Sequence, residues 1–235
     1  MNSLFKEAFC YKDSQCTLIS DKQTGIEIGK QSIKRNRQLL DEYIVLHRKF
    51  VWTLEPFLVP EGPPVAVLMA QAAEKAAVGP MAAVAGVLAD LAVADMVAGG
   101  CEIAVVEDGG EVAAVSNVPV DVAVAAGNEP LSKQFGFRLT EFPIGVATSS
   151  GRFSHAISFG DAEAVTIFCK NAGLADAAAT AVCNIVKGQD IDMAIKSGID
   201  KARSIEGVEG ALILYKGCFG TWGKIPQLIK IDQAL

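Results

Sequence analysis

Apolar and polar positions in the first sixty residues follow two different patterns. Between Phe5 and Ser20 they are mixed on both sides of Lys12-Asp13-Ser14, which predicts a β-hairpin that turns there and forms an edge of a sheet. From Ser32, a candidate helix cap, apolar residues recur at intervals of three, four and seven. They are Ile33, Leu40, Ile44, Val51 and Leu54, and they predict a long amphipathic helix that ends near Pro56.

The other face of this helix is charged. It carries Lys34, Arg35, Arg37, Asp41, Glu42 and Arg48. Runs of charge usually face solvent, so we expect the helix to pack on the domain with this face exposed. A surface for a partner or for a second copy of the chain is the alternative, which leaves a homo-oligomer open.

An Ala-rich region follows the Pro-rich linker at 60–64. It predicts two helices separated at Val78-Gly79-Pro80, with Pro80 in the first turn of the second helix and Gly99-Gly100 at its end. Strands are predicted at about 101–107, 111–116, 118–125, 137–141, 145–148, 164–169, 210–215 and 224–231, and helices at 174–187 and 191–204. We therefore expect an α+β fold in which helices cover a largely antiparallel sheet. Residues 1–235 would form one domain, with 1–60 as an N-terminal extension of hairpin and long helix.

Composition and charge exclude several classes of protein. With 51% hydrophobic residues and a mean hydropathy of +0.32, the chain has enough apolar surface to fold, which excludes a disordered chain. The formal charge of -6 argues against nucleic acid as a partner. Charged residues interrupt the apolar region at 63–100, so we expect no membrane span.

The six cysteines are scattered, without a CxxC motif or a Cys/His cluster, which argues against zinc. The chain begins without a basic-then-apolar signal segment. We therefore expect a cytoplasmic protein with reduced, buried thiols.

The first candidate site is the stretch 105–115, in which Gly109-Gly110 lies between acidic residues. Glu107 and Asp108 precede the glycines and Glu111 follows them. Asp-Gly between two apolar strands is typical of a hairpin turn. Alternatively, the glycines admit a planar or phosphorylated ligand against bare backbone, and the acids accept its hydrogen bonds; both interpretations can hold together.

The second candidate is the stretch 144–160. A strand there ends in Thr148, Ser149, Ser150 and Gly151, whose hydroxyls and backbone N–H groups would suit an oxyanion or phosphate. His155 follows and is the candidate catalytic residue, because it is one of only two histidines in the chain. A polar loop with a surface histidine is the alternative. The GxSxG motif is absent, which argues against a serine hydrolase.

The third candidate lies on the helix predicted at 174–187. Asp176 and Thr180 are four residues apart, which places both oxygen ligands on one face, where they would suit Mg²⁺. The structural alternative is a first-turn acid favoured by the helix dipole and a threonine bonded to a preceding carbonyl. A fourth stretch, 78–86, contains Gly79 and Met81 at a helix start whose free N–H groups would hold an anion.

Together and in this order, VGPMAAVAG, VVEDGGEV, GVATSSG followed by SH, and LADAAATAV resemble the ApbE-like superfamily, and most closely an uncharacterised ApbE-related family. The resemblance covers roughly 63–187. It implies an α+β, T-fold-like architecture. It also implies a Mg²⁺-dependent protein that binds FAD or transfers FMN from FAD to a threonine or serine of an acceptor protein.

Several positions of the chain match the motifs of that superfamily. The resemblance assigns the metal to Asp176 and Thr180 and the flavin pocket to Gly109, Gly110 and Glu111. Thr148, Ser149 and Gly151 match an ATSG segment with one serine inserted, and His155 takes the place of a histidine that assists proton transfer.

The chain also departs from the transferase pattern. It has no lysine within 80–86, no DPxTG motif after His155, and Glu107 where the pattern has asparagine. We therefore expect a protein that binds FAD, FMN or another phosphorylated ligand with Mg²⁺, with FMN transfer as the implied reaction. A non-catalytic binding or scaffolding protein, and an enzyme acting on a different small phosphorylated metabolite, are the alternatives.

Overall fold

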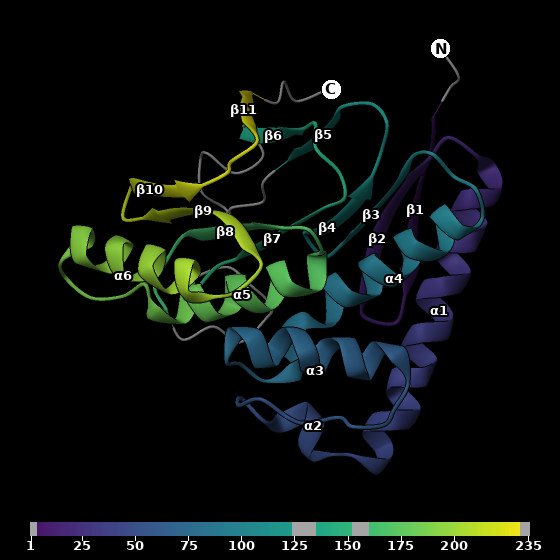
Figure 1. The fold of residues 1–235 in the computed structure, drawn as a ribbon, viewed down its shortest axis with the longest axis horizontal. Helices are drawn as coiled ribbons and strands as arrows, with labels where there is room; N and C mark the ends of the chain where they lie inside the picture. The colour runs from purple at the N-terminus through teal and green to yellow at the C-terminus, as the bar shows by residue number, and fades with distance from the viewer. Residues whose placement is uncertain (1–3, 124–134, 152–159, 231–235) are drawn as a thin grey trace.

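The computed structural model describes residues 4–123, 135–151 and 160–230, in which one large sheet organises the molecule (Figure 1). Its eight strands follow the order β1-β2-β3-β4-β7-β8-β9-β10, and each neighbouring pair is antiparallel. The strands are β1 (Phe5–Tyr11), β2 (Ser14–Ser20), β3 (Ala104–Asp108), β4 (Glu111–Val115), β7 (Ile144–Ser149), β8 (Ala164–Cys169), β9 (Val208–Tyr215) and β10 (Cys218–Gly223). The expected α+β fold with a largely antiparallel sheet is confirmed.

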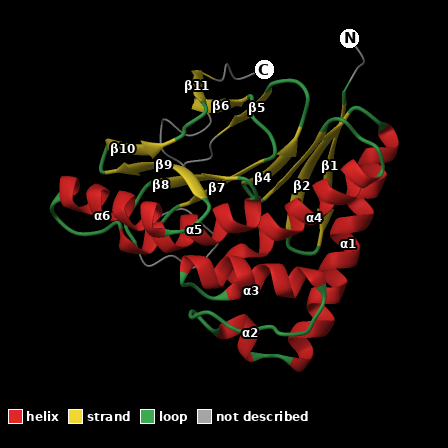
Figure 2. Ribbon diagram, viewed as in Figure 1, coloured by secondary structure: helices red, strands yellow, loops and turns green. Residues whose placement is uncertain are grey.

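Helices cover one face of this sheet (Figure 2). They are α1 (Gln23–Leu46), α2 (Lys49–Trp52), α3 (Pro64–Ala76), the 3₁₀ turn η1 (Pro80–Ala83), α4 (Val84–Ala98), α5 (Ala172–Ile185) and α6 (Ile191–Ser204). A three-stranded sheet with the order β11-β6-β5 completes the described structure; it consists of β11 (Gln227–Lys230), β6 (Phe135–Leu139) and β5 (Val120–Ala123). Its Phe137 packs edge-on against Phe168 of β8, so the large sheet is buried on both faces at its centre.

The N-terminal hairpin and long helix are both present, but the bounds of the helix differ from the prediction. The hairpin turns at Lys12-Asp13, and β1 lies at the edge of the sheet as expected. The helix begins at Gln23, and Ser32 is a buried mid-helix residue instead of a cap. It ends at Leu46, and Val51 belongs to the separate short helix α2.

Buried glycines explain the early start of α1. A Cβ atom at Gly29 would lie 2.5 Å from Leu18 Cδ2, and one at Gly25 would lie 2.4 Å from Ser20 Oγ. These glycines let the first turns of α1 pack directly on β2. A search for apolar side chains at helical spacing does not register glycines as buried, so it places the start of the helix too late.

The C-terminal strands also differ from the prediction. The strand expected at 224–231 is β11, at Gln227–Lys230 in the small sheet, and β10 was not predicted at all. Four of the six residues of β10 are exposed, and Gly220 and Gly223 interrupt it, so it contains no run of buried apolar side chains that would predict a strand. All six cysteines are free, but Cys10 and Cys218 are exposed, which corrects the expectation of buried thiols for these two.

The apolar character of α4 follows from burial on several sides. Among the described residues, the stretch Pro80–Ala98 is long and apolar enough, by composition alone, to cross a membrane. In the structure it packs against α1, α5 and the β3–β4 hairpin, and Leu88, Ala92 and Met96 are buried. A core helix enclosed in this way needs apolar residues around most of its circumference.

Candidate functional site

Three acidic side chains, two from the large sheet and one from a helix that covers it, come together. Asp108 ends β3, Glu111 begins β4, and Asp176 lies on α5. We call these residues the acidic cluster. Their charges affect one another: the charge of Asp108 raises the pKa of Asp176, and that of Asp176 raises the pKa of Glu111, although burial is the larger cause in both cases.

The sheet's alternation places Asp108 and Glu111 on the helix-covered face. Val106 and Ala113, two residues along the same strands, pack in the core beneath α1 and α4. Between them, Gly109 and Gly110 have φ values of 68° and 116°, so the turn requires glycine. A Cβ at Gly110 would meet nothing within 4 Å, so this stretch is a hairpin turn that also leaves open space beside its backbone.

Neighbouring groups fix the two acids on β3. The hydroxyl of Ser14 donates a hydrogen bond of 2.9 Å to Asp108 Oδ2, and the backbone N–H of Gln15 donates one of 3.1 Å to Oδ1. Glu107 Oε1 accepts a hydrogen bond of 2.9 Å from the N–H of Gly110. Glu107 therefore stabilises the turn, while Asp108 is held in place by hydrogen bonds from the start of β2.

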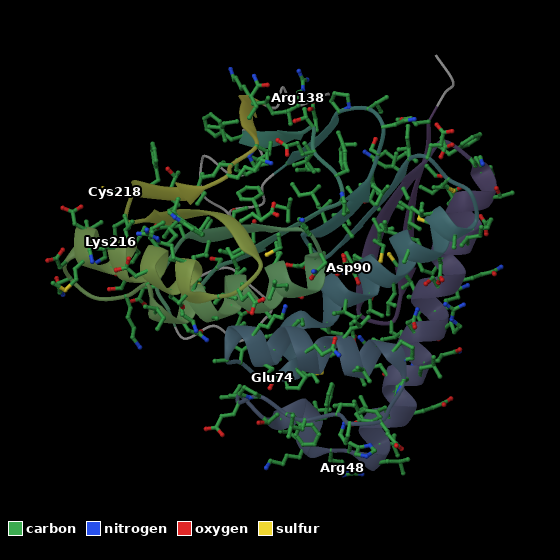
Figure 3. The ribbon with its side chains drawn as sticks, viewed as in Figure 1. Arg48, Glu74, Asp90, Arg138, Lys216 and Cys218 are labelled. Carbon is green, nitrogen blue, oxygen red and sulfur yellow. The ribbon has the colours of Figure 1, made fainter. Side chains whose placement is uncertain are left out.

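Two aspartates link α4 and α5 reciprocally. Asp176 Oδ2 on α5 accepts a hydrogen bond of 3.1 Å from the N–H of Gly86, in the first turn of α4. Asp90 on α4 accepts bonds of 2.8 Å from the N–H groups of Ala172 and Gly173, at the start of α5. Figure 3 shows Asp90 at this junction. Each acid thus satisfies free N–H groups at the N-terminus of the other helix.

Burial makes the charged forms of Asp176 and Glu111 unfavourable. Removal of water from the carboxyl group raises the pKa of Asp176 to about 7, in spite of the N–H groups of Gly86 and Ala85 that lower it. Burial also raises the pKa of Glu111 well above its ordinary value. Acids in such a setting are ionised more readily when a cation approaches them.

The hydroxyl groups of Thr180 and Ser149 lack hydrogen-bond partners among the described residues. Thr180 is 8% exposed, and its hydroxyl makes no hydrogen bond with any described residue, so the back-bonded threonine considered above is not observed. Ser149 Oγ is buried and also has no partner among the described residues. Strand alternation places Ser149 on the same face as Ala147, which packs in the core beneath α5.

The remaining residues singled out in the sequence have other surroundings. The Thr148 hydroxyl lies 2.9 Å from that of Thr166, on the face of β7 opposite to Ser149. A Cβ at Gly79 would lie 1.9 Å from the carbonyl oxygen of Thr53, which gives this glycine a packing role. Met81 packs, partly buried, against the helix core.

The two residues after β7, Ser150 and Gly151, form hydrogen bonds with the segment that precedes β8. The N–H of Gly151 donates a hydrogen bond of 3.0 Å to the carbonyl of Ala162, and the Ser150 hydroxyl donates a long one of 3.5 Å to the same oxygen. A Cβ at Gly151 would lie 1.9 Å from the carbonyl oxygen of Gly160. His155 lies outside the described residues.

The donor set fits a hard cation that has few protein ligands. Within the described ranges, no group of three or more His, Cys, Asp or Glu side chains is arranged to hold a metal ion. Asp176 and Thr180 nevertheless offer a carboxylate and an unpaired hydroxyl, both of which suit Mg²⁺, which commonly completes its shell with water and phosphate oxygens. The open backbone at Gly110 leaves room for a ligand that would supply them.

Long-range contacts account for the residues that sequence reasoning missed. It singled out neither Ser14, which is 94 residues from its partner Asp108, nor Asp90, which is 82 residues from its partner Ala172. Nothing in the local sequence around either residue indicates these partners. The sequence did indicate two parts of the site, through the spacing of Asp176 and Thr180 and through the acids around Gly109-Gly110.

Comparison with known proteins identifies the family. A family model described as "AbpE bacteria" matches residues 17–206. A UPF0280 protein of Methanococcus vannielii is 37% identical over 98% of this chain and 95% of its own length. One from Methanocaldococcus jannaschii is 36% identical over 98% of this chain and 96% of its own length.

Solved structures are similar in fold. The apo form of the flavinyl transferase ApbE from Pseudomonas stutzeri matches with a TM-score of 0.63 and 16% identity, covering 94% of each chain. The ApbE protein of Thermotoga maritima matches with a TM-score of 0.58 and 14% identity, covering 98% of this chain and 97% of that one. At these identities the likeness concerns the fold alone. The chain therefore belongs to the UPF0280 family and has an ApbE-like fold.

Proposed function

We propose that this protein binds a flavin nucleotide together with Mg²⁺ at the acidic cluster. The observation that carries the proposal is the state of Asp176, a partly buried carboxyl group whose pKa is raised to about 7 and which lies one helical turn from the unpaired hydroxyl of Thr180. A divalent cation bound to these two groups would offset the negative charge of the acidic cluster.

The surrounding residues would orient the cation and admit the ligand. The N–H of Gly86 holds Oδ2 of Asp176 and so orients the carboxylate, whose Oδ1 would bind the metal. The open side of Gly110 would let a nucleotide approach the backbone of the turn, and the buried Ser149 hydroxyl would donate a hydrogen bond to it. When bound, Mg²⁺ would supply positive charge to the phosphate oxygens of the ligand.

The similarity to a flavinyl transferase, together with the sequence motifs, makes FMN transfer to a threonine or serine the reaction to test. In that reaction His155 would act as the acid or base. The missing lysine within 80–86 and the missing DPxTG motif favour the rival, a cytoplasmic protein that binds the nucleotide without turnover.

A titration followed by flavin fluorescence tests the binding proposal. Purified protein is titrated with FAD and FMN, with and without Mg²⁺, beside the Asp176→Asn and Thr180→Val variants. Asp192→Asn, at an exposed position of α6, is the matched control. We expect saturable binding that requires Mg²⁺, is weakened at least about tenfold in both site variants and is unchanged in the control. Equal binding by Asp176→Asn, or binding independent of Mg²⁺, would contradict the proposal.

Mass spectrometry separates transfer from binding. Protein, FAD and Mg²⁺ are incubated with threonine-containing peptides, and the peptides are examined for a covalent FMN adduct. If the protein is a transferase, His155→Ala should reduce the rate of adduct formation by about two orders of magnitude or more. Saturable binding without an adduct would favour the non-catalytic rival.

A further inference from the structure

A cavity of about 680 Å³ lies apart from the acidic cluster, between α3, α4 and the first residues of β7 and α5. Small side chains from several elements leave it unfilled: Ala72, Ala94, Ala98, Ala113, Ala114 and Gly173. Larger apolar residues, including Leu68, Val87 and Leu91, complete its walls. Its volume lies within the range of about 300–1,000 Å³ that is usual for small-molecule sites.

Two cations line this cavity. Lys75 on α3 and Lys170 at the end of β8 are both exposed, and neither makes a hydrogen bond or ion pair with any described residue. The charge of Lys75 also lowers the pKa of the buried Cys169 thiol, although burial raises that pKa overall.

The acid that lines the cavity is already engaged. Asp90 uses both carboxylate oxygens for the N–H groups of Ala172 and Gly173, where the dipole of α5 also offsets its charge. No other acidic side chain among the described residues lines the cavity. Its available charge is therefore positive, in a chain whose formal charge is -6.

We infer that this cavity is a second ligand site, which binds a small molecule with an apolar body and one anionic group, either a carboxylate or a phosphate. The apolar body occupies the space beside Ala94 and Leu91, and the anionic group lies at the mouth, between Lys75 and Lys170. The inference is independent of the flavin proposal, because the cavity shares no residue with the acidic cluster.

Calorimetric titration with four probes of one chain length tests this inference. The probes are octanoate, octyl phosphate, 1-octanol and octylamine, which differ mainly in the head group. We expect octanoate or octyl phosphate to bind more tightly than octanol, and octylamine to bind most weakly. The ratio of the dissociation constants of octanoate and octyl phosphate shows whether the site prefers a carboxylate or a phosphate. Octanol or octylamine binding as tightly as the better anion would overturn the inference.

Variants locate the binding. In a Lys75→Gln, Lys170→Gln double variant, we expect the better anion to bind about three- to tenfold more weakly while octanol binding is unchanged. Lys196→Gln on α6 removes one exposed positive charge elsewhere and should change neither anion binding nor octanol binding. Ala94→Trp should fill the cavity and abolish binding of all probes while circular dichroism shows a folded protein. Undiminished anion binding in either cavity variant would refute the site.

Sedimentation of the same proteins tests the competing occupant, a second copy of the chain. We expect the wild type and Ala94→Trp to sediment alike at all concentrations. If the wild type self-associates, Ala94→Trp dissociates it and no probe binds, then the cavity is part of an interface between copies and the inference is wrong.

Discussion

Asp176 is suited to bind a cation, and it lowers the stability of the folded protein when no cation is bound. Its carboxylate is partly buried, and the N–H of Gly86 is one of the few groups that compensate its charge. A buried charge without full compensation destabilises the folded state. Stability traded in this way is common where a protein keeps a charged group for function.

Replacement of this residue should therefore separate stability from binding. Without Mg²⁺, we expect Asp176→Asn to raise the free energy of unfolding by about 1–2 kcal/mol, since it removes a poorly solvated charge and keeps an acceptor for Gly86. With FAD and Mg²⁺ present, the wild type should gain thermal stability and the variant should not. Urea denaturation and thermal melting measure both effects. A variant less stable than the metal-free wild type would point to a purely structural aspartate.

Asp90 makes the stability of the protein depend on pH. Burial raises its pKa from 3.8 to about 6, which exceeds the effect of the N–H groups of Ala172 and Gly173. As pH rises through this interval, the unfolded chain releases its proton first, so the contribution of Asp90 to stability falls with increasing pH.

Asp90→Asn does not titrate and isolates this contribution. Relative to the variant, the wild type should lose about 1–3 kcal/mol of unfolding free energy between about pH 4 and pH 7. Urea denaturation at several pH values measures the difference, with Asp192→Asn as an exposed control. A wild type that becomes more stable than Asp90→Asn as pH rises would show that the assigned direction of the pKa shift is wrong.

At the scale of elements, the contact between α4 and α5 positions the site. A Cβ at Gly86 would lie 2.3 Å from the carbonyl oxygen of Ala172, and one at Gly145 would lie 2.1 Å from the carbonyl carbon of Asn171. Backbones this close leave no room for side chains. Gly86 thus brings the start of α4, and with it its own N–H, to Asp176, while Gly145 lets β7 approach the start of α5.

Gly86→Ala should accordingly reverse the usual order of helix propensity. Alanine inside a helix is ordinarily favoured over glycine by about 1 kcal/mol. Here we expect a loss of about 1–3 kcal/mol in unfolding free energy, because the new methyl group would separate the two helices. Gly62→Ala, whose Cβ would meet side-chain atoms at 3.1 Å or more, is the control. Chemical denaturation in which Gly86→Ala is as stable as the wild type would contradict the close approach.

Most elements could be predicted from the sequence, because their signals are local. The turn at Gly109-Gly110, the stop at Gly99-Gly100, and β8 and α6 all follow from residues inside or next to each element. The start of α1 and the whole of β10 could not be predicted, since both depend on what packs against glycines or exposed residues. The reciprocal roles of Asp90 and Asp176 depend on contacts between distant segments.

At the scale of the molecule, burial is greatest in the middle of the large sheet. Every residue of β8 is buried, between α5 on one face and the three-stranded sheet on the other. β1 and β10 form the edges, and four of the six residues of β10 are exposed. This gradient should extend to local stability.

Hydrogen exchange measures that gradient directly. We expect the amides of β7, β8 and α5 to exchange most slowly and those of β1, β10 and β11 to exchange orders of magnitude faster, because opening an edge disrupts fewer buried contacts. Mass spectrometry of proteolytic fragments resolves these segments. Protection of β1 equal to that of β8 would mean that the edge is covered in solution.

Binding of metal and nucleotide at the acidic cluster can be tested by a crystal structure of the protein grown with FAD and Mn²⁺, in which anomalous scattering locates the metal. We expect a metal peak in contact with Asp176 and Thr180, with phosphate oxygens of the nucleotide completing its shell beside Gly109-Gly110. A metal bound elsewhere, or FAD held only in the cavity beside Lys75 and Lys170, would contradict it.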